Sequence, residues 1–314
     1  MSELECIHCH QSNTVLVENI PAPVLLKLYK KKFKLDIVNE LKGVDSIALR
    51  QCKNCDLRFY YPLLPGSDVF YEQLQNFGWY YVEDKYEYSI AAEYVKAGEK
   101  ILDVGCGWGS FSKYVKHAQF TGLEYNQKAI AIGKQNGIKI LNELSGQHAL
   151  THKEEYDVVT SFQVLEHVAD VSGFLKECYT CVKPGGLLII SVPSEDSFIS
   201  DLPNLVMNMP PHHISRWTDK AMYKIAEQLG GQVVSLVHDR DMNPILKFMY
   251  VSNIAYVALS KMLGGYKKKM LDLSFRYKVL EKIGKVFGLI LKSGVTGNLM
   301  PAGHSVTIII KKPL

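Results

Sequence analysis

The chain has 314 residues, of which 47% are hydrophobic and 22% charged, which excludes an extensively disordered protein and leaves room for one large domain and a small one. It shows no basic-then-apolar leader and no apolar run of about 18 residues, so we expect a cytoplasmic protein without a membrane span. The net charge of +4 is unevenly distributed. From residue 242 onward, 12 basic residues stand against two acidic ones, a net of +10, whereas the rest of the chain carries −6.

Near the N-terminus lie two Cys-x-x-Cys pairs, separated by 42 residues: Cys6, Cys9, Cys52 and Cys55. Two such turns can close a tetrahedral thiolate site, and a complete four-thiolate shell leaves no open position for chemistry. The sequence therefore predicts a structural zinc ion in a small module over residues 1–62, with His8 and His10 as alternative ligands.

Next comes an aromatic segment, residues 63–97, which we interpret either as packing helix or as a lid. From 98 to 241, short apolar segments alternate with helical patterns, which is typical of a doubly wound α/β sheet. Strands are expected over 100–104, 120–125, 138–141, 156–162, 187–193 and 232–239, with helices starting at Ser110 and over 126–137, 171–182 and 219–230. Residues 301–314 then supply the final strand of the core, after a helical insertion over 242–300.

A glycine turn follows the first core strand, with Gly105, Gly107 and Gly109 spaced G-x-G-x-G. Glycines there let backbone N–H groups approach a ligand closely. Asp103 puts a carboxylate beside that ligand, which disfavours a pyrophosphate but suits a cationic group. Glu124 ends the second strand, where an acid can accept hydrogen bonds from ribose hydroxyls.

The segments LDVGCGWGSF, GLEY, YDVVTSFQVLEHV and VKPGGLLIISVPS together resemble successive motifs of class I S-adenosylmethionine-dependent methyltransferases, over about residues 98–240. The resemblance implies a Rossmann-like methyltransferase sheet in which Asp103 and the first two glycines surround the methionine end of the cofactor. It also implies that Glu124 holds the ribose and that Tyr125 flanks the adenine. The full set expected around the cofactor is Asp103, Gly105, Cys106, Gly107, Gly109, Glu124, Tyr125 and Gln163, with Glu143 and Leu144 on the adenine side.

More narrowly, the chain resembles methyltransferases that modify sugars, which often carry a zinc module in front; CKNCDLRFYYP resembles the end of such a module. This resemblance implies an acceptor hydroxyl or carbon on a sugar, nucleotide sugar or glycolipid. A protein that binds the cofactor without turnover is the alternative from another class, and the intact glycine turn and Glu124 speak against it.

A loop of about 25 residues, ending in NMPPHHISRW, must cross the mouth of the site because it follows the fifth strand. Methylation of a hydroxyl requires removal of a proton, and histidine is the usual base near neutral pH. His212 or His213 is therefore the expected general base. Arg216 is a candidate for holding an anionic group of the acceptor, and Trp217 either stacks on a ring or packs in the core.

Glu166 and His167 give a rival interpretation. The stretch FQVLEHV resembles ubiquinone-biosynthesis O-methyltransferases and small-RNA 2′-O-methyltransferases, in which a Glu-x-x-Glu-His run supplies divalent-metal ligands. The resemblance implies a metal-assisted transfer to a phenol, a quinone or an RNA ribose. Gln163 stands in place of the first Glu, and an amide is a poorer ligand for Mg²⁺ than a carboxylate, so this sequence disfavours Mg²⁺.

In the basic insertion, Val279, Ile283, Val286 and Ile290 recur at helical spacing, with lysines off that stripe. One interpretation is a helical cap that packs on the core. The other is a peripheral helix pair at the anionic inner face of a membrane, near a lipid-linked acceptor. Nothing in the sequence indicates sequence-specific nucleic-acid binding.

Overall fold

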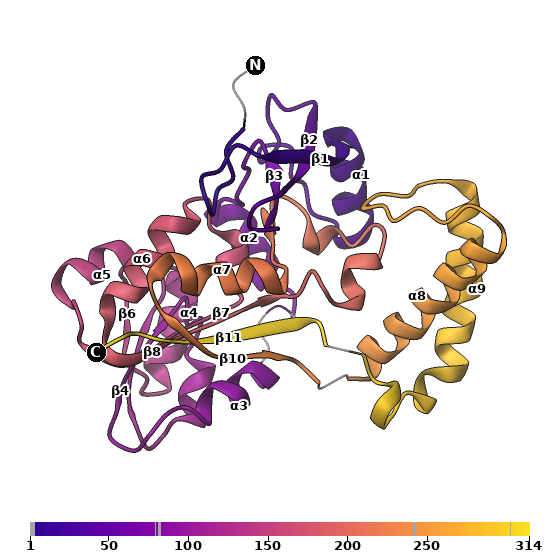
Figure 1. Cartoon of the computed structure of the whole chain (residues 1–314). Coiled ribbons are helices and arrows are strands. Elements are labelled where there is room, and N and C mark those ends of the chain that lie inside the picture. The colour runs from indigo at the N-terminus through magenta and orange to yellow at the C-terminus, as the bar shows by residue number, and fades with distance from the viewer. Residues whose placement is uncertain (1–3, 79, 81–82, 241–242, 302) are drawn as a thin grey trace.

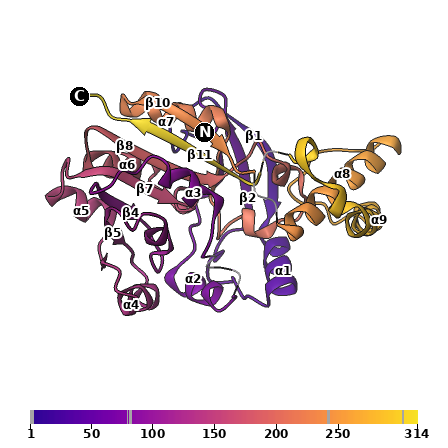
Figure 2. The same ribbon diagram turned by 90° about the horizontal axis from the view of Figure 1, so that it is seen from below.

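The computed structural model describes residues 4–78, 80, 83–240, 243–301 and 303–314. Its centre is a seven-stranded sheet in the order β10-β11-β8-β7-β4-β5-β6 (Figure 1 and Figure 2). The strands are β4 Lys100–Val104, β5 Gln119–Leu123, β6 Ile140–Leu141, β7 Tyr156–Phe162, β8 Val182–Pro193, β10 Gln232–His238 and β11 Ser305–Lys311. The first five are parallel, whereas β11 runs antiparallel between β8 and β10. This mixed sheet confirms the expected Rossmann-like fold.

Residues of the central strands alternate between two apolar clusters because successive side chains of a strand point to opposite faces. Val159 and Ile190 pack with residues of α6 and α7 on one face, whereas Val158 and Ile189 pack with residues of α3 on the other. The helices of the core are α3 Tyr86–Ala92, α4 Gln127–Gln135, α5 Ser145–Thr151, α6 Val171–Cys181 and α7 Asp219–Leu229. The segment from Ser110 forms only a short 3-10 helix, Ser110–Tyr114, and α5 was not predicted from the sequence.

A second sheet joins the N-terminal region to the histidine loop. Its strand order is β1-β2-β3-β9, with β1 Thr14–Pro21, β2 Ser46–Cys52, β3 Arg58–Tyr61 and β9 Ser215–Arg216. The helix α1 Ala22–Phe33 follows β1. The last strand, β9, comes from the end of the long loop and pairs antiparallel with β3. The region that carries the cysteines is therefore continuous with the loop that carries His212 and His213.

Two segments lie outside the central sheet. The aromatic segment contains α2 Asp68–Gln75 and α3, while Trp79, Tyr81 and Val82 lie outside the described residues. In the basic insertion, α8 Pro244–Met262 and α9 Phe275–Leu291 form a hairpin that extends away from the sheet (Figure 1 and Figure 2). None of the helices in the described ranges combines the length and apolar character that crossing a bilayer requires.

Candidate active site

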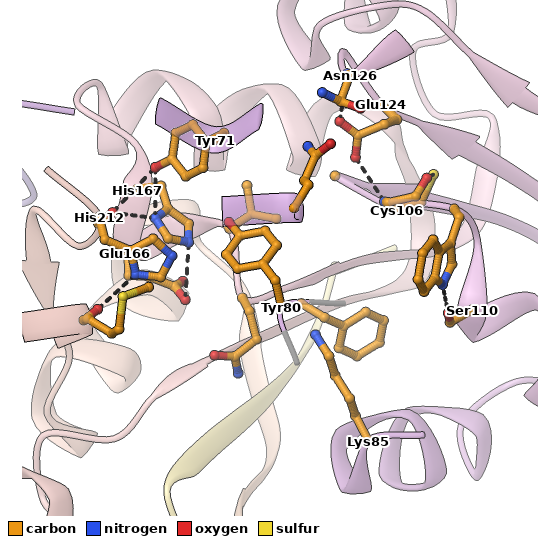
Figure 3. Close-up of a pocket in the computed structure, with 18 of the residues that line it drawn as sticks. Tyr71, Tyr80, Lys85, Cys106, Ser110, Glu124, Asn126, Glu166, His167 and His212 are labelled. Carbon is orange, nitrogen blue, oxygen red and sulfur yellow. Dashed lines mark hydrogen bonds and ion pairs between the residues drawn. The ribbon is translucent and has the colours of Figure 1, made fainter. Parts of the chain in front are cut away.

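A pocket of about 1240 Å³ opens at the carboxyl ends of β4, β5 and β7. This is the crevice where open α/β sheets bind their ligands, because the chain leaves the sheet toward opposite sides there. The glycine turn with Glu124 forms one wall, and Tyr71, Glu166, His167 and His212 form the opposite wall (Figure 3).

The glycine turn has the backbone geometry that its sequence predicts. Gly105, Gly107 and Gly109 all have positive φ, at 75°, 56° and 84°. A Cβ at Gly105 would collide with the side chain of Val164. Gly105, Cys106 and Gly107 line the pocket, whereas Gly109 belongs to the turn but is not among the lining residues. The turn thus leaves its backbone close to a bound ligand.

Glu124 is held in place by three backbone amides. Oε2 accepts a hydrogen bond from Gly107 N–H at 2.8 Å, and Oε1 accepts from Tyr125 and Asn126 N–H at 2.9 Å each. The carboxylate lines the pocket (Figure 3). Each carboxylate oxygen can accept more than one hydrogen bond, so Glu124 is preorganised to accept from the hydroxyls of a ribose.

Asp103 is buried at the base of the same wall. Its Oδ1 accepts a hydrogen bond from the Thr160 hydroxyl at 2.8 Å. Burial raises the pKa of this carboxyl to about 7, against smaller lowering effects of Thr160 and of the Lys85 charge. A cationic ligand group would stabilise the ionised form, as the amino group of a methionine moiety would. Lys85, a pocket residue that the sequence analysis missed, also lies 5.5 Å from the Tyr88 ring centroid.

Of the other residues expected around the cofactor, only some line the pocket. Tyr125 lines the pocket and is 56% exposed, which leaves its side chain accessible to the adenine ring that it is expected to flank. Gln163 also lines the pocket; it has φ 58°, and its Nε2 lies within hydrogen-bond distance of Glu87 Oε1 and Ser305 Oγ. Glu143 and Leu144 are not part of the pocket lining; Glu143 instead binds His148.

The opposite wall brings together all four residues expected to act in catalysis. Glu166 and His167 lie in the 3-10 turn Leu165–His167, directly after β7. The loop that carries His212 and His213 lies beside this turn, because Ile214 N–H donates to the Glu166 carbonyl at 2.9 Å. The Nε2 atoms of His167 and His213 lie 3.7 and 3.8 Å from Glu166 Oε1. His167, His212 and His213 each place a ring nitrogen within 4.8 Å of the others. We call Glu166, His167, His212 and His213 the histidine cluster.

The backbone fixes which ring nitrogens of the cluster carry a proton. His167 Nδ1 lies 2.5 Å from the His212 carbonyl oxygen, and His212 Nδ1 lies 2.8 Å from that of Met207. Since a carbonyl only accepts, both Nδ1 atoms donate, and in the neutral ring each Nε2 keeps its lone pair. Among the described residues, neither Glu166 oxygen nor His212 Nε2 has a hydrogen-bond partner.

Burial disfavours the charged forms of all four residues of the cluster and so shifts their pKa values. It raises the pKa of Glu166 to about 8 and lowers the pKa of His167 to about 4. Burial also lowers the pKa values of His212 and His213 well below their ordinary range. Near neutral pH the cluster therefore holds neutral imidazoles beside a protonated Glu166, and Nε2 of His167 and Nε2 of His213 face that carboxyl group.

Arg216 and Trp217 do not reach the pocket. Arg216 is almost fully buried, and its guanidinium pairs with Glu195, donating from Nε to Oε2 at 2.7 Å. Trp217 is fully buried, with its ring centroid 5.3 Å from that of His8. The expectation that Arg216 binds an anionic group of the acceptor is therefore wrong, because Arg216 is buried away from the pocket in an ion pair with Glu195.

The four N-terminal cysteines form a compact buried cluster. The Cys6 and Cys55 sulfurs are 3.6 Å apart, and those of Cys9 and Cys52 are 3.4 Å apart. All four sulfurs lie within 4.8 Å of one another. A tetrahedral site with Zn–S bonds of about 2.3 Å separates its sulfurs by about 3.8 Å, so the cluster has the dimensions of such a site. A hydrogen bond with Cys55 lowers the pKa of Cys6 to about 5, which favours a thiolate.

A sequence profile for a methyltransferase domain matches residues 73–236, more than half of the chain and the part that supplies most of the residues lining the pocket. The chain belongs to this methyltransferase family. Together with the sheet order and the pocket, the match makes it an S-adenosylmethionine-dependent methyltransferase, as the sequence motifs predicted. The glycine turn, Asp103 and Glu124 fit the cofactor by their chemistry: close backbone, a carboxylate for its cationic end and a fixed acceptor for ribose hydroxyls.

Curated relatives of the methyltransferase match over a shorter range. Ubiquinone biosynthesis O-methyltransferase from Pseudomonas putida is 36% identical over 103 residues, which are 30% of this chain and 44% of that protein. The protein of the same name from Azoarcus sp. is 34% identical over the same shares. The match thus covers less than half the length of these relatives.

Solved structures were also compared with the chain. A SAM-dependent methyltransferase from Archaeoglobus fulgidus has a TM-score of 0.48 and 18% identity, covering 71% of this chain and 90% of that one. A structure described as a putative methyltransferase from Bacillus halodurans has a TM-score of 0.47 and 16% identity, covering 72% and 97%.

Replacing Glu124 with Ala should weaken binding of S-adenosylhomocysteine by at least about tenfold, because two hydrogen bonds to a charged acceptor are lost. Isothermal titration calorimetry measures this, with Glu93→Ala, on the exposed end of α3, as the matched control. Equal affinity of the Glu124 variant and the unchanged protein would contradict the assignment of the ribose site.

Proposed function

We propose that this methyltransferase methylates a hydroxyl group of a small-molecule acceptor and that the histidine cluster takes the hydroxyl proton. One observation carries the proposal: Glu166 is buried, unpaired among the described residues, and faces the Nε2 atoms of His167 and His213. A hydroxyl needs a positioned proton acceptor to be alkylated near neutral pH, whereas an amine already offers a lone pair.

The residues of the pocket then have distinct roles. When bound, S-adenosylmethionine supplies an electrophilic methyl group. Asp103 and Glu124 bind its two ends from one wall of the pocket. On the opposite wall, in the fraction of the protein in which Glu166 is ionised, Nε2 of His167 or His213 accepts the proton of the acceptor hydroxyl. The Glu166 carboxylate then stabilises the imidazolium that forms. In this arrangement, an adjacent acid orients the base and balances the charge that the base acquires.

A sugar, nucleotide sugar or glycolipid is the acceptor class that we favour. Asp239, Asn243 and His304 line the pocket, and His304 Nδ1 lies 3.1 Å from Asp239 Oδ2. Such side chains suit an acceptor with several hydroxyls. A phenol or quinone is the second candidate, supported by the names of the ubiquinone-biosynthesis relatives and by the rings of Tyr71 and Tyr80 in the pocket.

A cation bound to the histidine cluster is the competing mechanism. The three imidazoles have the spacing of metal ligands, and Glu166 would complete the set. Such a set of three nitrogens and one carboxylate suits a transition-metal ion better than Mg²⁺, which prefers oxygen ligands. Activity that is lost in EDTA while the protein keeps its cysteine-bound zinc, and that an added transition metal restores, would favour this mechanism over proton transfer to the imidazoles.

For the four N-terminal cysteines, the proposed ligand is a structural zinc ion. The support is their spacing and their complete burial beside Trp217 and α7. Four thiolates would saturate the ion, so it would contribute stability and no chemistry.

The test of the proposed function is the site of methylation in the product. The protein is incubated with S-adenosylmethionine carrying a ¹³C methyl group and with panels of sugars, nucleotide sugars, glycolipids and phenols. NMR of the product should show the label on oxygen. A label on nitrogen or carbon, or no turnover with any panel, would contradict the proposal.

A further inference from the structure

The outer face of α9 is apolar and uncovered. The side of α9 that faces α8 is built from Tyr277, Leu280, Gly284 and Gly288, and a Cβ at Gly284 would lie 2.5 Å from the Ser252 carbonyl oxygen. The two helices therefore pack closely through this side. The opposite side exposes a stripe of apolar side chains, which we call the α9 stripe: Phe275, Val279, Ile283, Val286, Phe287 and Ile290. Phe275 is 81% exposed and Ile290 65%.

Lysines follow one flank of the α9 stripe. At about 100° per residue, Lys278, Lys282 and Lys285 lie between the stripe and the side that packs on α8. All three are exposed, and Lys285 pairs with Glu281. The turn between the helices adds Lys267, Lys268 and Lys269. Over residues 242–300, ten basic residues stand against two acidic ones.

We propose that the α9 stripe docks on an anionic lipid bilayer surface. A helix with an exposed apolar face and lysines along its flank is the pattern of helices that lie in the membrane interface. Anionic headgroups attract basic segments that lie close to the surface. A second copy of the chain is a poorer partner, because it would bring two strongly basic hairpins together. This proposal concerns the surface alone and does not depend on the proposed function.

The hairpin is also continuous with the pocket. Asn243 caps the start of α8 by accepting from Ile245 and Leu246 N–H at 3.0 and 2.9 Å, and both Asn243 and Leu246 line the pocket. The hairpin extends from this point, away from the sheet (Figure 2). Docking through α9 would therefore connect the pocket to the bilayer through α8.

The test is co-sedimentation of the full chain with vesicles of phosphatidylcholine, with and without phosphatidylglycerol. Binding should be at least tenfold tighter to the anionic vesicles and should weaken as salt is raised. Ile283→Ser/Val286→Ser/Ile290→Ser should reduce it at least tenfold, and so should Lys278→Glu/Lys282→Glu. Leu150→Ser, at an exposed apolar residue of α5, is the matched control and should bind like the unchanged protein. Thermal melting should show that all variants are folded.

The proposal is overturned if the chain does not bind anionic vesicles, or if the triple serine variant binds them like the unchanged protein. A second outcome against it is a dimer in analytical ultracentrifugation that the triple variant loses, with no difference between the two vesicle types. That result would assign the α9 stripe to a contact between two copies.

Discussion

Replacing Glu166 with Gln should lower turnover by roughly 10²–10⁴-fold, the usual contribution of a positioned acid–base group. The amide keeps the size of the side chain but cannot become a carboxylate, so it cannot stabilise an imidazolium at His167 or His213, whose Nε2 atoms lie 3.7 and 3.8 Å away. Because the residues proposed to bind the cofactor lie on the other wall, affinity for S-adenosylhomocysteine should stay unchanged. Steady-state kinetics and calorimetry measure the two effects separately.

Glu227→Gln, on the exposed surface of α7, controls for the loss of a carboxylate as such. His212→Ala and His213→Ala should each lower turnover while the protein still binds the cofactor product. Full activity of the Glu166 variant would remove the cluster from the mechanism, and full activity of both histidine variants would reduce the pair to a packing role.

Replacing Cys52 with Ser should release the metal, unfold the N-terminal sheet and abolish activity, although no cysteine lines the pocket except Cys106. Cys52 ends β2, which pairs with β3, and β3 pairs with β9 at the end of the histidine loop. Tyr60 N–H, in β3, donates to the Ile214 carbonyl at 3.0 Å. Loss of a structural zinc ion costs on the order of 10 kcal/mol of folding free energy in small zinc modules.

Elemental analysis should give one zinc per chain for the unchanged protein and for the Cys178→Ala control, which removes a buried thiol of α6. It should give no bound zinc for the Cys52 variant, whose melting temperature should fall. A freshly purified chain without stoichiometric zinc would contradict the proposal, as would a Cys52 variant that keeps both its metal and its activity.

The sequence was most informative where local chemistry determines structure. The glycine turn after an apolar strand, together with Asp103 and Glu124, predicted residues that the structure places on one wall of the pocket, because each residue type has one strong physical reason to be there. The alternation of apolar segments predicted the central strands for the same reason. The antiparallel direction of β11, which is set by its pairing with β8 and β10, was not predicted. Helix α5 was not predicted either, since short elements depend on packing more than on propensity.

Contacts between distant segments were the other part that sequence reasoning missed. His213 was expected as a general base, and His167 as a divalent-metal ligand in the rival interpretation. The structure places both histidines, which are 46 residues apart in the sequence, beside Glu166. Likewise, the buried Glu195 pairs with both Arg216 and Arg58. No local sequence pattern indicates such pairs. Lys85, which also lines the pocket, was not predicted because the only pattern noted in its segment was the aromatic content.

The pH dependence of kcat/KM in the presence of EDTA tests the central claim most directly. Burial, with Glu87 adding to it and Lys85 opposing it, raises the pKa of Glu166 to about 8. Since the carboxylate is the active form, kcat/KM should rise with pH and level off above about pH 8, with no loss of activity in EDTA. A limb near pH 6–7, the range of an ordinary imidazole, or a profile that is flat from pH 6 to 9 would contradict the account.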